Sequence, residues 1–196
     1  MIPTLHIHGP IGEGQNTPPA IGAFLAENAG RPVCLVVNSF GGIAADGAAI
    51  MALIEQHGNV RAEVMGVAAS AASLLVMGAA RIAVHSAAHM MIHDPSNLVW
   101  GTAEDLRREA DNLDKLADTY ARAYSRATGH PVERVRGWMT AETWLTAEEA
   151  EALNFCDEVF GTDQSGEAVA AFDYTRFKAP PPAILRAARQ AGQGAA

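Results

Sequence analysis

Two serines, Ser70 and Ser73, lie inside residues 65–80, MGVAASAASLLVMGAA, a stretch without any charged side chain. A hydroxyl group buried in such a stretch costs about 1–3 kcal/mol unless it finds a hydrogen-bond partner. Ser70 falls where a predicted strand passes into a helix, and the free N–H groups of a helix start can stabilise an oxyanion. Ser70 is therefore a candidate nucleophile, with close helix packing as the alternative. Ser73, one turn further on, is expected to be a packing residue.

A nucleophilic serine requires a base within hydrogen-bond reach. The sequence has two lysines, Lys115 in a predicted long helix and Lys178 in a predicted tail, so a serine–lysine pair is disfavoured. Among the seven histidines, His93 ends a predicted apolar strand at a turn. Sites in α/β folds gather where strands end, which makes His93 a candidate base. Taken alone, a histidine in this position is more often structural.

Two groups of histidines invite a metal interpretation. His6 and His8 share one face of a predicted strand, and His85, His89 and His93 are spaced by four residues. The second group spans a strand, a turn and another strand, so helical spacing does not apply to it. We therefore expect no metal site and no cofactor.

A glycine-containing turn, NSFGG at residues 38–42, follows a continuous apolar run that is typical of a buried strand. One interpretation is a tight turn that needs glycine for its backbone conformation. The other is a backbone N–H group that points at a developing negative charge. The two adjacent glycines do not distinguish between these interpretations.

The composition indicates one globular domain with an acidic balance. The 196 residues are 49% hydrophobic and 18% charged, with a formal net charge of −8. No basic stripe is present, which disfavours a nucleic-acid partner. No apolar run reaches about 18 residues, so we expect no membrane span, and the N-terminus does not read as a secretory signal. Cys34 and Cys156 lie in apolar settings and are expected to be buried free thiols, which fits a reducing cytoplasm.

The segments that must position these residues alternate between strand and helix patterns. Strands are predicted at 4–9, 32–39, 60–67, 81–86, 89–94 and 156–160. Helices are predicted at 18–30, 43–57, 102–129, 131–139 and 146–154, and in the part of 65–80 that follows the strand 60–67. This alternation predicts an α/β fold with a mostly parallel sheet. We expect one domain at 1–160, followed by a tail at 161–196 that is either flexible or a docking segment.

The longest predicted helix, 102–129, has clear ends. Thr102 and Asp105 form a near capping box, and Gly129 is a stop signal. Apolar residues recur every three or four positions and form one stripe: Ala103, Leu106, Ala110, Leu113, Leu116, Tyr120 and Tyr124.

Four segments, in this order, resemble the ClpP-type serine peptidases: VNSFGG, MGVAASAAS, MMIHDP and ETWLTAEEAEALNFCDEV. The resemblance covers residues 4–160 and implies the ClpP/crotonase-type fold with a long protruding oligomerisation helix. The chain is most similar to the ClpP-related head maturation proteases of tailed phages, through WGTAEDLRREADNLDKLAD and ETWLTAEEA.

This resemblance implies a catalytic role for three residues. Ser70 matches the nucleophile, His93 the general base, and Glu142 the third triad member, where housekeeping relatives usually carry aspartate. Because of that departure, Asp46 and Asp94 are alternative acids.

The resemblance also implies how substrate is held. Gly42 and Ala71 match the two backbone donors of an oxyanion hole. Gly41 and Phe40 are the expected substrate-binding residues.

The implied function is an ATP-independent serine endopeptidase that cleaves phage capsid or scaffold proteins during head maturation. Its expected partners are that substrate and other copies of itself in stacked rings joined through residues 102–129. We expect it in the bacterial host cytoplasm or inside the procapsid. Independence from an ATPase is expected because only Met1–Pro3 precede the first predicted strand. The alternatives are a housekeeping-like ClpP subunit that works with an ATPase, a crotonase-like acyl-CoA enzyme and a non-catalytic ring component.

Overall fold

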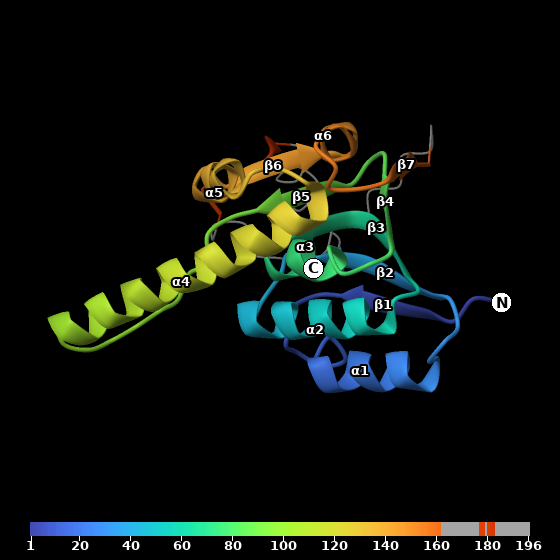
Figure 1. Cartoon of the computed structure of the whole chain (residues 1–196), viewed down its shortest axis with the longest axis horizontal. Helices are drawn as coiled ribbons and strands as arrows, with labels where there is room; N and C mark the ends of the chain where they lie inside the picture. Colours follow the sequence, from blue (N-terminus) through green and yellow to red (C-terminus); the bar gives the residue numbers. More distant parts are fainter. Residues whose placement is uncertain (162–176, 179, 183–196) are drawn as a thin grey trace, which may run out of the picture.

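A seven-stranded sheet forms the centre of the protein, whose computed structural model describes residues 1–161, 177–178 and 180–182 (Figure 1). The strands are β1 Thr4–His8, β2 Val33–Ser39, β3 Val60–Ala69, β4 Arg81–His85, β5 His89–Ile92, β6 Thr143–Thr146 and β7 Glu158–Phe160. The helices are α1 Pro18–Glu27, α2 Ala44–His57, α3 Ala71–Val76, α4 Ala103–Thr128, α5 Val132–Thr140 and α6 Ala147–Ala152. The predicted α/β fold with a mostly parallel sheet is confirmed.

The sheet divides at β3, which is its longest strand. The parallel strands follow the order β1-β2-β3-β4-β7. The first half of β3 pairs with β4, whereas its last residues, Val67–Ala69, pair in parallel with His89–Met91 of β5. β6 then runs antiparallel to β5. This division brings the ends of β3 and β5 side by side.

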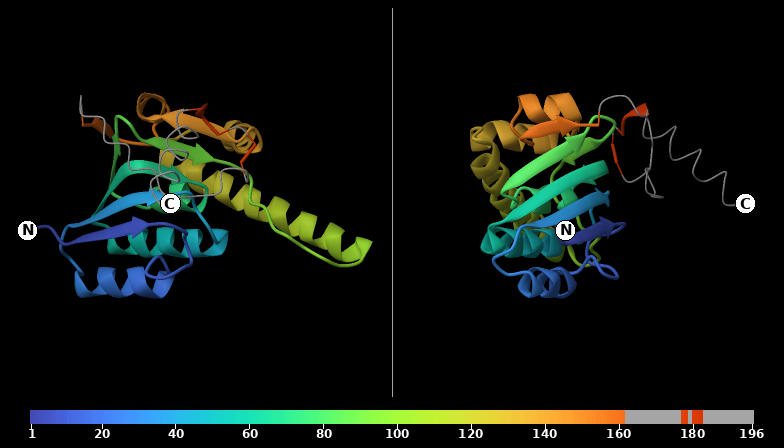
Figure 2. Two further views of the ribbon diagram at one scale, coloured as in Figure 1. Left: turned by 180° about the vertical axis from the view of Figure 1, so that it is seen from behind. Right: turned by 90° about the vertical axis from the view of Figure 1, so that its right-hand side faces the viewer.

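Helices α2 and α4 cover one face of the sheet, and α1 packs against α2 (Figure 2). Between the helices and the sheet lies a continuous apolar core. Its fully buried members include Ile7, Ile21, Leu35, Val37, Ile50, Ile54, Leu75 and Met90. The β-branched run of β2 contributes to this core, as expected for a strand inside a parallel sheet.

Helix α4 leaves the body of the molecule and protrudes beyond it (Figure 1). Its capping box is complete, since the Thr102 hydroxyl accepts from the Asp105 N–H and the Asp105 carboxylate accepts from the Thr102 N–H. Only its second half is buried, at Ala117, Tyr120, Ala121, Tyr124 and Thr128. No helix in the described part of the chain is long and apolar enough to cross a membrane.

Two local expectations differ from the structure. β3 continues to Ala69, so the helix predicted in the remainder of 65–80 is confined to Ala71–Val76. The pairing of Val67–Ala69 with β5 outweighs the helix propensity of the alanines there. β6 was not predicted, because its four residues form a strand only through their pairing with β5. Most of the predicted tail at 161–196 lies outside the described residues.

Candidate active site

Ser70 lies in the sharp turn between β3 and α3. Its φ of 56° and ψ of −124° are unusual for any residue other than glycine. Such a conformation costs about 1–3 kcal/mol and persists only where surrounding contacts impose it. The Ser70 N–H donates to the carbonyl of Met91 at 2.9 Å, which ties the turn to β5. The turn therefore holds the Ser70 hydroxyl at the edge of the sheet.

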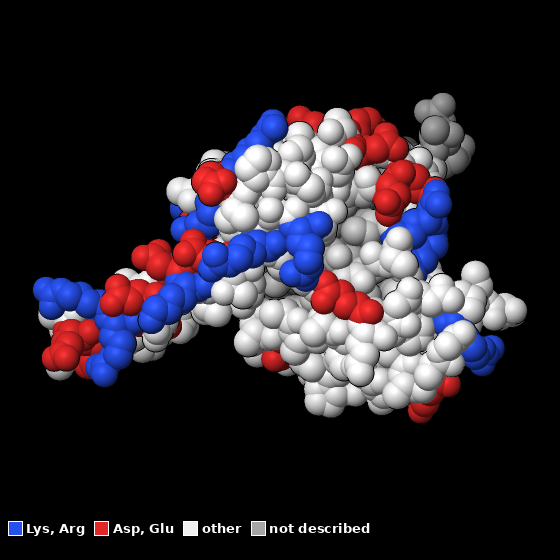
Figure 3. Space-filling view, viewed as in Figure 1, with Lys and Arg blue, Asp and Glu red and all other residues white. Residues whose placement is uncertain are grey.

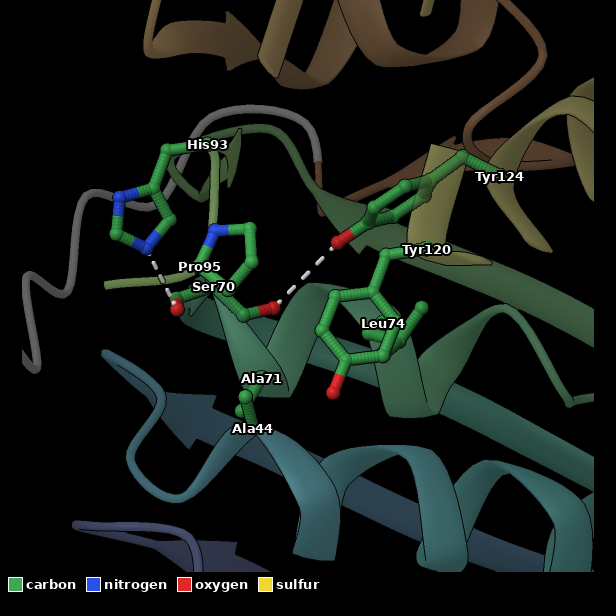
Figure 4. Close-up of a pocket in the computed structure, with 8 residues that line it drawn as sticks. All are labelled: Ala44, Ser70, Ala71, Leu74, His93, Pro95, Tyr120 and Tyr124. Carbon is green, nitrogen blue, oxygen red and sulfur yellow. Dashed lines mark hydrogen bonds between the residues drawn. The ribbon is translucent and has the colours of Figure 1, made fainter. Parts of the chain in front are cut away.

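His93 directly follows β5 and faces this hydroxyl (Figure 4). Its Nε2 atom lies 2.8 Å from Ser70 Oγ. The contact follows from topology, because Ala69 pairs with Met91 and the parallel strands β3 and β5 end together. Both side chains are partly exposed to solvent. The structure thus brings together the two candidate residues that chemistry alone had singled out.

The electrostatics of His93 favour its neutral form. Burial is the main cause and lowers the pKa of His93 below its ordinary value of 6.5. The carboxylates of Glu142 and Asp94 raise this pKa, and the Lys178 ammonium lowers it. A neutral imidazole can accept a proton from the hydroxyl that it contacts.

Glu142 lies in the turn between α5 and β6, with a φ of 53° and only 5% of its surface exposed. Its Oε1 accepts from Trp144 Nε1 at 3.4 Å, and its Oε2 accepts from the Lys178 N–H at 2.9 Å. Its negative charge acts on His93. A buried carboxylate beside a histidine can orient the ring and stabilise the imidazolium.

The two alternative acids have other surroundings. Asp94 forms an ion pair with Arg136 at 2.6 Å and accepts from the Thr140 hydroxyl at 3.0 Å. Asp46 lies in the first turn of α2 and faces Gly12, in the loop after β1.

The 38–42 turn lies against Ser70. A Cβ atom on Gly41 would come within 2.7 Å of Ser70 Cβ, so only glycine permits this approach. The Gly41 carbonyl accepts from the Ile11 N–H at 2.9 Å. In a trans peptide the next N–H points the opposite way, so the Gly42 N–H is directed away from Ile11. The backbone nitrogen of Ala71, the first residue of α3, would lie 3.0 Å from a Cβ atom on Gly41, so it is also close to this turn.

Ser73 is fully buried and has hydrogen-bond partners, as expected of a packing residue. Its Oγ lies 2.7 Å from the carbonyl of Met91, 2.8 Å from that of Ser70 and 2.8 Å from the Tyr124 hydroxyl. Burial raises the pKa of Tyr124, so the phenol stays protonated. Ser73 therefore fastens α3 to β5 and α4.

A pocket opens beside the Ser70 hydroxyl (Figure 4). Its walls are mostly apolar and come from α2, α3, the segment after β5, and α4. The lining residues are Ala44, Ser70, Ala71, Leu74, His93, Pro95, Tyr120 and Tyr124. Within the described part of the chain, no cluster of three or more His, Cys, Asp or Glu side chains could hold a metal ion.

Two residues near His93 were not anticipated. Phe177, which is buried, places its ring centroid 6.1 Å from that of His93, and Lys178 donates its N–H to Glu142. Both fall in the segment predicted as a tail, where no pattern marks a site. Trp144, the donor to Glu142, belongs to the segment ETWLTAEEAEALNFCDEV, but the sequence predicted no role for it.

Comparisons with known proteins show which family the chain resembles as a whole. Residues 20–163 match the family model described as Clp protease. The chain is 35% identical over 137 residues to the ATP-dependent Clp protease proteolytic subunit 2 of Thermobifida fusca, covering 68% of each chain. It is 31% identical over 138 residues to the protein of that name in Bacillus licheniformis, covering 68% of this chain and 72% of the relative.

The fold is similar to that of a ClpP1 mutant from Listeria monocytogenes. The TM-score is 0.69 at 22% identity, with 80% of this chain and 90% of the other covered. None of these three relatives is named as a phage protease, so the narrower resemblance to head maturation proteases stays a prediction.

Proposed function

The chain belongs to the Clp protease family, a family of peptidases, and on this premise we propose that it is a serine endopeptidase whose nucleophile is Ser70. The observation that carries the proposal is the 2.8 Å contact between Ser70 Oγ and His93 Nε2 at a strained turn. A serine that only packed a helix would need neither the strain nor a histidine partner.

His93 acts first as a base and then as an acid. It takes the Ser70 proton as Oγ attacks the peptide carbonyl, and it returns that proton to the departing amine. The resulting acyl-enzyme is hydrolysed by a water molecule that His93 activates in the same way. The buried carboxylate of Glu142 stabilises the imidazolium that forms in each step.

The oxyanion that develops on the substrate is held by the N–H groups of Gly42 and Ala71. The direction of the Gly42 N–H, away from Ile11, supports this role. Gly41 and Phe40, whose side chain is buried, offer their backbone to the substrate beside it. Each such donor contributes about 10²–10³-fold in rate in other acyl-transfer enzymes.

The apolar pocket beside Ser70 receives a side chain next to the scissile bond. Leu74, Pro95 and Tyr120 offer it no charged partner. We therefore expect apolar substrate side chains to be preferred over charged ones, because burying an unpaired charge is unfavourable.

The biological substrate that we propose is a phage capsid or scaffold protein, cleaved without ATP by a ring of identical subunits in the bacterial host or its procapsid. The segment WGTAEDLRREADNLDKLAD supports this assignment through its resemblance to head maturation proteases. A housekeeping-like subunit that works with an ATPase is the second candidate, favoured by the names of the two sequence relatives.

The test is cleavage of an unstructured protein by the purified chain, with and without ATP. We expect cleavage in the absence of nucleotide and none by Ser70→Ala. Equal cleavage by Ser70→Ala would refute the serine mechanism. No cleavage by the wild-type chain, with or without an ATPase, would be expected of an acyl-CoA enzyme or a non-catalytic ring subunit. Cleavage only after addition of an ATPase and ATP would favour the second candidate.

A further inference from the structure

We propose that Phe177 and Lys178 are positioning residues that hold His93 and Glu142 in their reactive arrangement. The inference rests on the proposed function and adds residues that lie outside the segment matched to the family, 20–163. It assigns a role to a short stretch beyond β7 that returns to the site.

Phe177 packs among the aromatic rings of Phe40, His93 and Trp144, a set that we call the aromatic nest. Its ring centroid lies 6.1 Å from those of Phe40 and His93 and 5.4 Å from that of Trp144. The rings of His93 and Trp144 meet it edge to face, at 65° and 87°, a favourable geometry for aromatic pairs. Only 9% of Phe177 is exposed. The ring therefore restricts the orientation of His93 on one side.

Lys178 acts on Glu142 through its backbone. Its N–H donates to Oε2 at 2.9 Å, while Trp144 Nε1 donates to Oε1 at 3.4 Å. A donor on each oxygen fixes the plane of the carboxylate. Without the Lys178 donor, this buried carboxylate would lose a hydrogen bond that holds its Oε2 atom, which is unfavourable.

The stretch supports the site and does not block it. Ser70 and His93 remain partly exposed with Phe177 in place. The pocket beside Ser70 shares only His93 with the residues that Phe177 and Lys178 contact in the interactions described above. A substrate can therefore approach Ser70 from the pocket while the other side of His93 stays packed.

Among the described residues, three charged groups act on the imidazole and define how its pKa responds to substitution. Glu142 and Asp94 raise the pKa of His93, and the Lys178 ammonium lowers it. If the Lys178 N–H is lost and the Glu142 charge is displaced, the pKa of His93 should fall further. The activity of such a variant would then be lower but would persist to lower pH.

The test compares matched variants of the full chain by peptide hydrolysis. Lys178→Pro and Lys178→Ala both remove the ammonium, and only the proline also removes the N–H. We expect Lys178→Pro to have a kcat about 10-fold or more below that of Lys178→Ala, with a similar KM and an acid limb at lower pH. Phe177→Ala should lose about 10-fold in kcat, and Phe177→Leu, which refills the nest, should retain most activity.

Two controls separate the possible failures. Reaction of the wild-type chain with a fluorophosphonate, read beside Ser70→Ala, tests the nucleophile, and thermal unfolding monitors the fold of each variant. A wild-type chain that does not react would overturn the proposed function and this inference together. A reactive wild type with equal kcat in Lys178→Pro and Lys178→Ala would overturn this inference alone. Higher activity in Phe177→Ala would also overturn it, because Phe177 would then obstruct access of the substrate to the site.

Discussion

The pair Ser70 and His93 places a residue with a strained backbone in contact with a neutral base. The positive φ of Ser70 is imposed from two sides, by its N–H bond to Met91 and by the close approach of Gly41. The pKa of His93 is lowered chiefly by burial, so the ring is uncharged at neutral pH. A neutral ring 2.8 Å from a hydroxyl is the form that general base catalysis requires.

This pKa shift predicts a pH profile. His93 must be unprotonated to act, so kcat/KM should fall on acidification through a single group whose pKa lies below the ordinary value of 6.5. The sign follows from burial, which disfavours the charged imidazolium and moves the acid limb to lower pH. The profile is measured with a peptide substrate between pH 4 and 8 (about the range over which the fold should persist). A limb above 6.5 would contradict a base that is desolvated in this way.

Residue chemistry raised two candidates of the proposed site. Ser70 was a candidate because a helix start offers free N–H groups, and His93 because sites in α/β folds gather where strands end. Glu142 came only from the resemblance, since a glutamate in a short turn carries no periodic signal. Phe177 and Lys178 could not be found, because their role depends on a tertiary return of the chain to Glu142 and His93.

Among the elements, α2 and α3 pack closely enough to fix where α3 begins. A Cβ atom on Gly47 of α2 would lie 2.8 Å from the carbonyl oxygen of Ala71 and 2.9 Å from its Cβ. Glycine at this position therefore allows α2 to support the turn that contains Ser70. The contact involves backbone atoms, so it cannot be relieved by a change of side-chain rotamer.

Gly47→Ala should therefore destabilise the protein by about 1–3 kcal/mol and slow the reaction of Ser70 with a fluorophosphonate. Gly22→Ala is the matched control, because its new methyl group would meet only the Leu53 side chain, at 3.4 Å. That variant should gain up to about 1 kcal/mol from helix propensity. Urea denaturation and labelling rates measure both effects. Similar behaviour of the two variants would show that the α2–α3 contact does not position Ser70.

A helix could be predicted closely where its apolar periodicity and the capping signals at its two ends indicated the same bounds. The helix predicted at 102–129 appears as Ala103–Thr128 because its capping box and final glycine are both local signals. The end of β3 and the whole of β6 depend on pairing with β5, a tertiary contact that local pattern does not contain. Those are also the strands beside the candidate site.

In the molecule as a whole, the protruding half of α4 is the least compact part of the described residues. Its apolar stripe continues beyond the body, with Leu106 47% and Leu116 40% exposed. Leu98 and Trp100, just before the helix, are more exposed still. On the face seen in Figure 3, acidic and basic side chains alternate with uncharged ones along the protruding half of α4. An apolar stripe edged by charges is typical of an interface between subunits.

We therefore expect the purified protein to be larger than a monomer and Leu106→Lys to reduce its mass. A buried lysine without a partner would destabilise the contact. Arg107→Ala, at the neighbouring exposed position, should leave the assembly intact. Light scattering coupled to size-exclusion chromatography gives the masses. A monomeric wild type, or assembly unaffected by Leu106→Lys, would argue against α4 as the contact.

The central claim, that Ser70 is the nucleophile, is tested most directly by locating a fluorophosphonate adduct by peptide mass spectrometry. The peptide that contains Ser70 also contains Ser73, so Ser70→Ala and Ser73→Ala are analysed beside the wild type. We expect one adduct on Ser70, none in Ser70→Ala, and a retained adduct in Ser73→Ala, because Ser73 is fully buried and hydrogen-bonded to Met91 and Tyr124. An adduct on Ser73, or no adduct on folded wild-type protein, would contradict it.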